Sequence, residues 1–213
     1  MIKKLFFITL LSALTLTSCL NPGETPDNMK PRAAAAFLQE SEDGEKIFIT
    51  DDGIVMYPDM PVAAPDSMLG RRYFVEFLLE SQTSTRFDIT LRSIQEMIVE
   101  GVTKGEPTGA SQPVIPATVW AYGDYLNMVL NVKTDPRPNF KFTLFDKGSA
   151  EEPNFVLRYD PKTNQPASAR RVALSFDISS YREALTVDSI LVPISINIEN
   201  TGVVESRIKI TKK

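Results

Sequence analysis

Apolar and polar residues alternate with a period of two along most of the chain. The alternation is most regular near the C-terminus, where one face of a single segment would carry Ile190, Val192, Ile194, Ile196 and Ile198. Successive side chains of a β-strand point to opposite faces of the sheet, so this spacing is typical of a half-buried strand. No segment shows the apolar spacing of a helix over several turns. The sequence therefore predicts an all-β protein.

The first group of predicted strands lies between residues 45 and 105. Alternation is clear over 73–79 and 87–91, and the polar stretch 81–85 between them reads as a hairpin loop. Shorter strands are predicted over 47–49, 54–57 and 94–99. Asp51, Asp52 and Gly53 separate the first two, and an Asp-Gly pair is a strong hairpin-turn signal. Residues 45–105 are therefore predicted to form a small β-domain.

A passage rich in glycine and proline, residues 101–113, interrupts the alternation and is the best candidate for a domain boundary. Strands resume after it, separated by polar turn clusters. They are predicted over 118–122, 126–132, 140–145, 155–159, 171–178, 190–198 and 203–210. Short strands at this spacing indicate an antiparallel β-sandwich over residues 111–213.

The N-terminus has the features of a bacterial lipoprotein signal. Lys3 and Lys4 precede an apolar run over 5–16, and residues 16–19 read Leu-Thr-Ser-Cys, which looks like a lipobox. Residues 1–18 are predicted to be a cleaved signal peptide and Cys19 the lipidated N-terminus. Two acyl chains, at about 0.8 kcal/mol per buried methylene, suffice for stable membrane anchoring. The alternative is an ordinary signal peptide in which Cys19 is incidental.

Residues 19–44 are predicted to form the lipidated N-terminus and a flexible tether. The segment is polar, contains Pro22, Pro26 and Pro31, and carries an alanine run over 33–36 that could form one helical turn. A flexible chain of this length has a root-mean-square reach of about 25–30 Å.

The absence of histidine, together with a single cysteine, removes most catalytic chemistry. Nucleophile systems that depend on histidine are excluded, as are histidine metal sites. Asp51 and Asp52 could form an acid pair or contribute to a calcium loop, but a turn explains them better, since neighbours in a strand face opposite ways. The chain is predicted not to be an enzyme and to carry no cofactor and no metal. Its formal net charge of −4 argues against nucleic acid as a partner.

Aromatic residues are the remaining candidates for a binding site. Trp120, Tyr122, Asp124 and Tyr125 are close in sequence, and exposed rings beside a carboxylate could bind a sugar by stacking and hydrogen bonding. The competing interpretation places Trp120 in the core of the sandwich, as is common for a large residue on a central strand. For Tyr122 and Tyr125 both interpretations stay open.

Four segments together resemble the NigD-like lipoproteins of the Bacteroidetes cell envelope. They are IFITDDGIVMYPD over 47–59, RRYFVEFLLE over 71–80, WAYGDYLNMVLNV over 120–132 and RVALSFDIS over 171–179. The resemblance extends over residues 47–210, and its most specific element is the Trp-x-x-Gly-Asp-Tyr-Leu-Asn stretch from Trp120 to Asn127. It implies an OB-like β-barrel followed by the β-sandwich, and it implies no catalytic residues.

These observations predict a lipid-anchored, non-enzymatic envelope protein that binds another envelope macromolecule, and a protein is the favoured partner. The alternatives are a glycan-binding module for polysaccharide capture and a bacteriocin-immunity protein, the latter suggested by the family's name. The expected location is the outer membrane. Surface-exported lipoproteins of these bacteria carry a serine and acidic run after the cysteine, and residues 20–24 lack one, so the periplasmic face is favoured.

Overall fold

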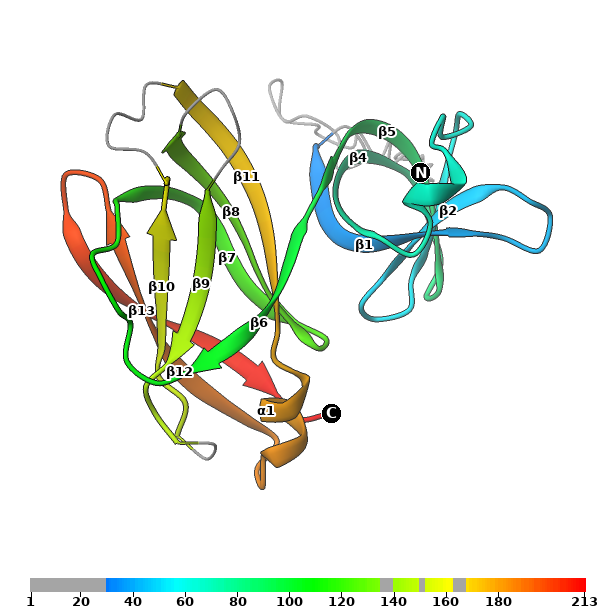
Figure 1. Ribbon diagram of the computed structural model, residues 1–213. Coiled ribbons are helices and arrows are strands. Elements are labelled where there is room, and N and C mark those ends of the chain that lie inside the picture. The colour runs from blue at the N-terminus through cyan, green and yellow to red at the C-terminus, as the bar shows by residue number, and fades with distance from the viewer. Residues whose placement is uncertain (1–29, 135–139, 150–151, 163–167) are drawn as a thin grey trace, which may run out of the picture.

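The computed structural model describes residues 30–134, 140–149, 152–162 and 168–213, which form a small barrel followed by a larger sheet (Figure 1). The predicted signal peptide and Cys19 lie outside the described residues. In the described part of the chain, no helix is long and apolar enough to cross a membrane. The all-β prediction is confirmed.

The N-terminal unit is a closed five-stranded barrel in the order β1-β2-β3-β5-β4. Its strands are β1 (Arg32–Glu40), β2 (Lys46–Thr50), β3 (Val55–Pro58), β4 (Arg72–Gln82) and β5 (Arg86–Glu96). β3 pairs with β5 in parallel, and the other pairs, including the closing pair of β1 and β4, are antiparallel. The barrel interior is filled by one apolar side-chain cluster, which includes Ala36, Leu38, Phe48, Met56, Val75, Phe77 and Ile89. This is the OB-like barrel that the resemblance implied.

The prediction of a tether as far as residue 44 is wrong from Arg32 onward. Residues 32–40 form β1, which pairs with β2 on one side and with β4 on the other. Ala36 and Leu38 are fully buried in the barrel. Alanine favours a helix locally, but hydrogen bonding on both sides of the strand outweighs that preference. A helical turn over the alanines is therefore also wrong.

The larger unit is one sheet in the order β10-β9-β6-β11-β8-β7-β12-β13, and an additional pairing of β10 with β12 folds it back on itself. The first four strands along the chain are β6 (Ile98–Lys104), β7 (Val114–Tyr122), β8 (Tyr125–Thr134) and β9 (Lys141–Asp146). The others are β10 (Phe155–Asp160), β11 (Ser168–Asp177), β12 (Ser189–Ile198) and β13 (Gly202–Thr211). One short helix, α1 (Ser179–Ala184), follows β11.

The predicted end of the barrel domain at residue 105 also needs correction. β6 lies within the range 45–105, yet it pairs in parallel with β11 and β9 and so belongs to the larger sheet. β5 ends at Glu96 and β6 begins at Ile98, so only Met97 separates two strands that belong to different sheets. Because neither glycine nor proline marks this crossing, local sequence carries no signal of it. The predicted antiparallel pairing holds for β7–β8, β8–β11, β9–β10 and β12–β13.

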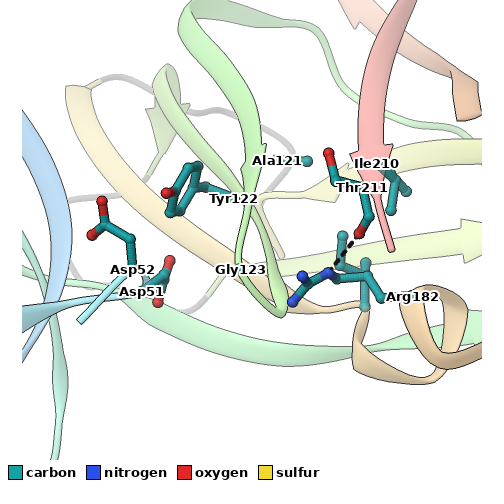
Figure 2. A pocket seen from close by; sticks show the side chains of 9 residues that line it. Asp51, Asp52, Ala121, Tyr122, Gly123, Arg182, Ile210 and Thr211 are labelled. Carbon is teal, nitrogen blue, oxygen red and sulfur yellow. Dashed lines mark hydrogen bonds between the residues drawn. The ribbon is translucent and has the colours of Figure 1, made fainter. Parts of the chain in front are cut away.

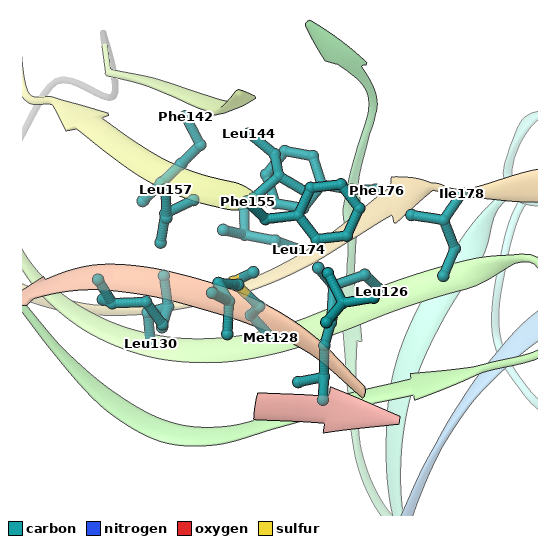
Figure 3. Packing of buried hydrophobic residues seen from close by; sticks show 14 of the residues in the cluster. Leu126, Met128, Leu130, Phe142, Leu144, Phe155, Leu157, Leu174, Phe176 and Ile178 are labelled. Carbon is teal, nitrogen blue, oxygen red and sulfur yellow. The ribbon is translucent and has the colours of Figure 1, made fainter. Parts of the chain in front are cut away.

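The core of the larger unit lies between the two halves of the folded sheet (Figure 3). β8 and its neighbour β11 contribute alternate residues to it, and β9 and β10 contribute residues from the other side. The side chains labelled in Figure 3 are almost fully buried: Leu126, Met128, Leu130, Phe142, Leu144, Phe155, Leu157, Leu174, Phe176 and Ile178. Burial of apolar area at about 25 cal/mol per Å² is the main stabilising contribution.

A buried carboxylate at the end of β9 ties three elements together. Asp146 accepts hydrogen bonds from Lys104 Nζ at 2.5 Å and from the Tyr181 hydroxyl at 2.9 Å. The backbone N–H groups of Gly148 and Asn154 donate to its other oxygen at 2.9 and 2.8 Å. Four donors on one buried carboxylate therefore link β6, β9 and α1.

We expect Asp146 to make the fold sensitive to acid. Burial by itself would raise the pKa of Asp146, but the hydrogen bonds from Lys104, Asn154, Gly148 and Tyr181 outweigh it and hold the pKa below the ordinary value. A group whose pKa is lower in the folded than in the unfolded state contributes its full stabilisation of the fold above the unfolded-state pKa. This contribution is lost as the pH falls through the folded-state pKa. Urea unfolding should therefore show stability declining below about pH 4.

The matched variants are Asp146→Asn and Asp43→Asn, the latter in the exposed turn after β1. Asp146→Asn should lower the free energy of unfolding at pH 7 by about 2 kcal/mol and flatten its dependence on pH between pH 3 and pH 5. Asp43→Asn should leave the stability at pH 7 almost unchanged. Parallel pH profiles for Asp146→Asn and the native chain would contradict this role.

Candidate functional site

A buried arginine joins the barrel to the larger sheet. Arg72 begins β4, and its side chain has no exposed area. Nη1 and Nη2 each donate to one carboxylate oxygen of Asp51 at 2.5 Å, so the ion pair is bidentate. Asp51 lies in the turn between β2 and β3, and only 5% of its side chain is exposed. Within the barrel, therefore, the charge of Arg72 is neutralised by one partner.

The same guanidinium reaches three residues of the larger sheet. Its Nε donates to Ser175 Oγ at 2.8 Å, and Nη2 donates to Asn127 Oδ1 at 3.2 Å. Its Cζ atom lies 3.9 Å from the centre of the Tyr125 ring, a cation–π contact. β8 and β11, which carry these residues, are thus both contacted by this one side chain of the barrel.

Apolar packing surrounds this polar contact. A separate small core is formed by residues of both units: Ala35, Phe74, Met97, Val129 and Ala173, with Trp120 packed against it. The Trp120 and Phe74 rings lie 6.2 Å apart between centroids. Since Trp120 belongs to this junction, the interpretation that places it in the core of the sandwich is wrong. The two units are held together by an apolar cluster and by Arg72.

A cavity of about 330 Å³ opens beside this junction (Figure 2). The turn between β2 and β3 forms one wall, and the turn between β7 and β8 forms another. α1 and the end of β13 close the far side. The lining residues are Asp51, Asp52, Ala121, Tyr122, Gly123, Ile178, Arg182, Ile210 and Thr211.

A second cavity of about 200 Å³ shares part of this lining. Asp51, Asp52 and Tyr122 line both cavities, and the second is also lined by residues of β1 and by Trp120. Its lining residues are Ala33, Ala34, Ala35, Thr50, Asp51, Asp52, Ile54, Trp120 and Tyr122. The two cavities are called here the junction cleft. Tyr122, which lines both cavities with Asp52, is 50% exposed.

Of the four predicted binding residues, the structure places two in the cleft. Tyr122 and Trp120 line it, on the same face of β7. Tyr125 lies against Arg72, and burial raises the pKa of its hydroxyl. Asp124 accepts a hydrogen bond from Arg182 Nη1 at 2.6 Å and lies 3.5 Å from Lys213 Nζ. Tyr125 and Asp124 are thus committed to contacts within the protein.

The predicted turn at Asp51, Asp52 and Gly53 is confirmed. The Gly53 N–H donates to the Thr50 carbonyl at 3.0 Å, and Gly53 has a φ of 80°, which favours glycine. Gly123, in the opposite turn, approaches Asp51 so closely that a Cβ atom at that position would lie 2.6 Å from the Asp51 Cβ. The two turns therefore meet only because residue 123 has no side chain. Among the described residues, no three carboxylates or other ligand side chains gather into a metal site.

Sequence reasoning missed Arg72, Asn127 and Ser175 as junction residues. The sequence of β4 did contain a signal that this strand contacts a second layer. Tyr73 and Val75 face the barrel core, whereas Arg72 and Phe74 face the other way. An apolar Phe74 on the face assigned to solvent indicates a strand that is buried on both sides.

Solved structures that resemble this chain include proteins from Bacteroidetes species. A NigD-like immunity protein from Bacteroides caccae matches with a TM-score of 0.62 and 17% identity, over 85% of this chain and 97% of that chain. The chain shares its fold with the NigD-like immunity protein. This confirms the resemblance at the level of the fold, including the barrel and the larger β-unit. No protein-family model matches the sequence, and no curated protein matches it either.

Two other solved structures are similar to this chain. A protein of unknown function from Bacteroides vulgatus has a TM-score of 0.65 and 15% identity, over 86% of this chain and 92% of that chain. A "Putative lipoprotein" from Bacteroides fragilis has a TM-score of 0.53 and 14% identity, over 86% of this chain and 99% of that chain. At these identities the likeness concerns the fold, and the function has to be argued from the site.

Proposed function

We propose that this chain is a lipid-anchored, non-enzymatic cell-envelope protein that binds another envelope protein at the junction cleft. The observation that carries the proposal is the Arg72 cluster, which holds the barrel and the larger sheet together at the cleft. A cleft between two firmly coupled units is preformed, so binding costs little conformational entropy. Tyr122 is half exposed within it and offers an aromatic contact.

The anchor and the location rest on the sequence. The lipobox-like residues 16–19 support lipidation of Cys19, and the "Putative lipoprotein" from Bacteroides fragilis has a similar fold. The outer membrane, with the chain facing the periplasm, remains the proposed place. The name of the NigD-like immunity protein supports a narrower version, in which the bound protein is a bacteriocin. Unaltered bacteriocin sensitivity after deletion of the gene would contradict that version alone.

Glycan binding is a second candidate function. Trp120 and Tyr122 lie two residues apart on β7 and line the cleft together with Asp52. Aromatic faces stack on the apolar faces of sugars, and a carboxylate accepts hydrogen bonds from their hydroxyl groups. The sequence-based sugar hypothesis also included Tyr125 and Asp124, which contact Arg72 and Arg182 instead, so Asp52 supplies the carboxylate in this version.

In-cell photo-cross-linking tests the proposal. A photoreactive residue at Ala121, which lines the cleft, should yield a discrete protein adduct. The same residue at Val203, which is 73% exposed on β13, should not yield it. A Cys19→Ala chain should lose both membrane association and the adduct. Identical adducts from both positions, or none from Ala121, would contradict a protein-binding cleft, and recovery of polysaccharide alone would favour the glycan candidate.

A further inference from the structure

Two adjacent acids in the turn between β2 and β3 have different partners. Asp51 is almost buried and its charge is neutralised by Arg72. Asp52 is exposed and accepts a hydrogen bond from the Thr50 hydroxyl, which is uncharged. Within the described ranges, no lysine or arginine forms an ion pair with Asp52. Among the described residues, Asp51 thus forms an ion pair with an arginine, whereas Asp52 does not.

An aromatic ring accompanies each acid. Tyr125 lies against the Arg72 guanidinium, with 3.9 Å between the ring centre and Cζ. Tyr122, on the facing strand of the same hairpin, pairs with Tyr125 across β7 and β8. Its side chain points toward the turn that carries Asp52 (Figure 2). Tyr122 and Asp52 line both cavities of the junction cleft. Partial burial raises the pKa of Tyr122, and the nearby Asp52 carboxylate raises it further.

The arginine that lines the first cavity has other partners than Asp52. Arg182 lines the same cavity, but its Nη1 donates to Asp124 at 2.6 Å. Its Nε donates to the Thr211 carbonyl at 2.8 Å and its Nη2 to the Lys212 carbonyl at 3.3 Å. All three nitrogens of Arg182 are committed to the end of β13 and to Asp124. Asp52 and Tyr122 therefore offer a carboxylate and a half-exposed ring to a cation from outside the chain.

We infer that Asp52 and Tyr122 receive an arginine side chain of the bound protein. The inference rests on the proposed function and names the group that is recognised there. A planar guanidinium can pair with a carboxylate and lie over an aromatic ring at the same time, as Arg72 does with Asp51 and Tyr125. Lysine, a point charge without a planar fork, fits this pair of contacts less well.

Capped arginine, N-acetyl-arginine methylamide, is the probe for this site. Trp120 is the only tryptophan of the chain and lines the part of the cleft that contains Asp52 and Tyr122, so its fluorescence reports occupancy. With the full chain in detergent, capped arginine should give a saturable change. Capped citrulline, which has the same shape without the charge, should bind at least about fivefold more weakly. Salt should weaken the arginine response.

Matched variants separate the charge from the ring. Asp52→Asn should weaken capped arginine at least about fivefold, and Tyr122→Leu about threefold or more. Tyr122→Phe keeps the ring and should bind as the native chain does. Asp43→Asn removes an exposed acid remote from the cleft and should change nothing. Unchanged thermal unfolding midpoints confirm that each variant is folded, since Asp52 and Tyr122 are exposed.

The inference is overturned by an equal response to arginine and citrulline, by no saturable response, or by unaltered binding in Asp52→Asn. The cross-link from Ala121 distinguishes this failure from failure of the proposed function. An adduct that persists undiminished in Asp52→Asn cells leaves protein binding intact and removes the arginine contact. An adduct missing from native cells removes the proposed function itself, whereas an adduct lost in Asp52→Asn and kept in Asp43→Asn supports both.

Discussion

Replacement of Arg72 by methionine is expected to lower the free energy of unfolding by about 3–5 kcal/mol, because the change leaves the buried Asp51 carboxylate without its cation. It also removes the donors to Ser175 and Asn127, so the barrel and the larger sheet should lose part of their coupling. Urea unfolding measured by circular dichroism and by Trp120 fluorescence should then give separate transitions, since Trp120 reports the junction. In the native chain the two should coincide.

Two further variants identify the cause of this loss. Arg71→Met changes an exposed neighbour and should alter stability by no more than about 0.5 kcal/mol. Combining Arg72→Met with Asp51→Leu removes both charges, so it should restore a large part of the stability lost in Arg72→Met. If the double variant is less stable than Arg72→Met alone, the stranded charge is not the cause.

Phe176→Ala is the second change with a large expected effect. Phe176 is fully buried in the core shown in Figure 3, and truncation leaves a cavity that the closed sheet cannot fill, at a cost of about 3–5 kcal/mol. Thermal and urea unfolding should both show it. Phe176→Leu keeps most of the volume and should cost about 1.5 kcal/mol.

Ser175 is the neighbour of Phe176 on β11 and points to the opposite face of the strand, toward the junction with the barrel. Ser175 is fully buried and accepts from Arg72 Nε, so Ser175→Ala leaves that donor unpaired at a cost of about 1–3 kcal/mol. Its effect should appear in the Trp120 signal, whereas that of Phe176→Ala should appear in the overall unfolding. Indistinguishable profiles for the two variants would contradict the division of β11 into a core face and a junction face.

Local sequence patterns predicted two kinds of element: strands with one buried face, and turns that contain residues typical of turns. The alternation over 190–198 lies within β12, and Asp51, Asp52 and Gly53 form the predicted turn. β1 was missed because alanine has no marked preference for one face, so its pairing with β2 and β4 depends on residues far along the chain. β6 was assigned to the wrong unit because its partners β9 and β11 follow it by about 40 and 75 residues.

Only part of the candidate site was predicted, because the rest also depends on residues that are far apart in the sequence. Cross-strand pairing places Trp120 opposite Asn127 and Tyr122 opposite Tyr125, so all four residues share the face of the hairpin that meets the barrel. Sequence alone drew attention to the aromatics but could not distinguish Tyr122, which is exposed, from Tyr125, which is covered by Arg72. That difference is decided by β4, which lies about 50 residues earlier in the chain.

Both sheets close on themselves, the barrel through β1 and β4 and the larger unit through β10 and β12. Unpaired strand edges are templates for aggregation, and closure removes most of them. β13, the last strand of the larger sheet, carries Glu205, Arg207 and Lys209 on alternate positions, and charges on an outer strand discourage edge-to-edge pairing. A lipid anchor would confine many copies to two dimensions at high local concentration. The closed sheets would then allow crowded neighbours on one membrane to collide without assembling into fibrils.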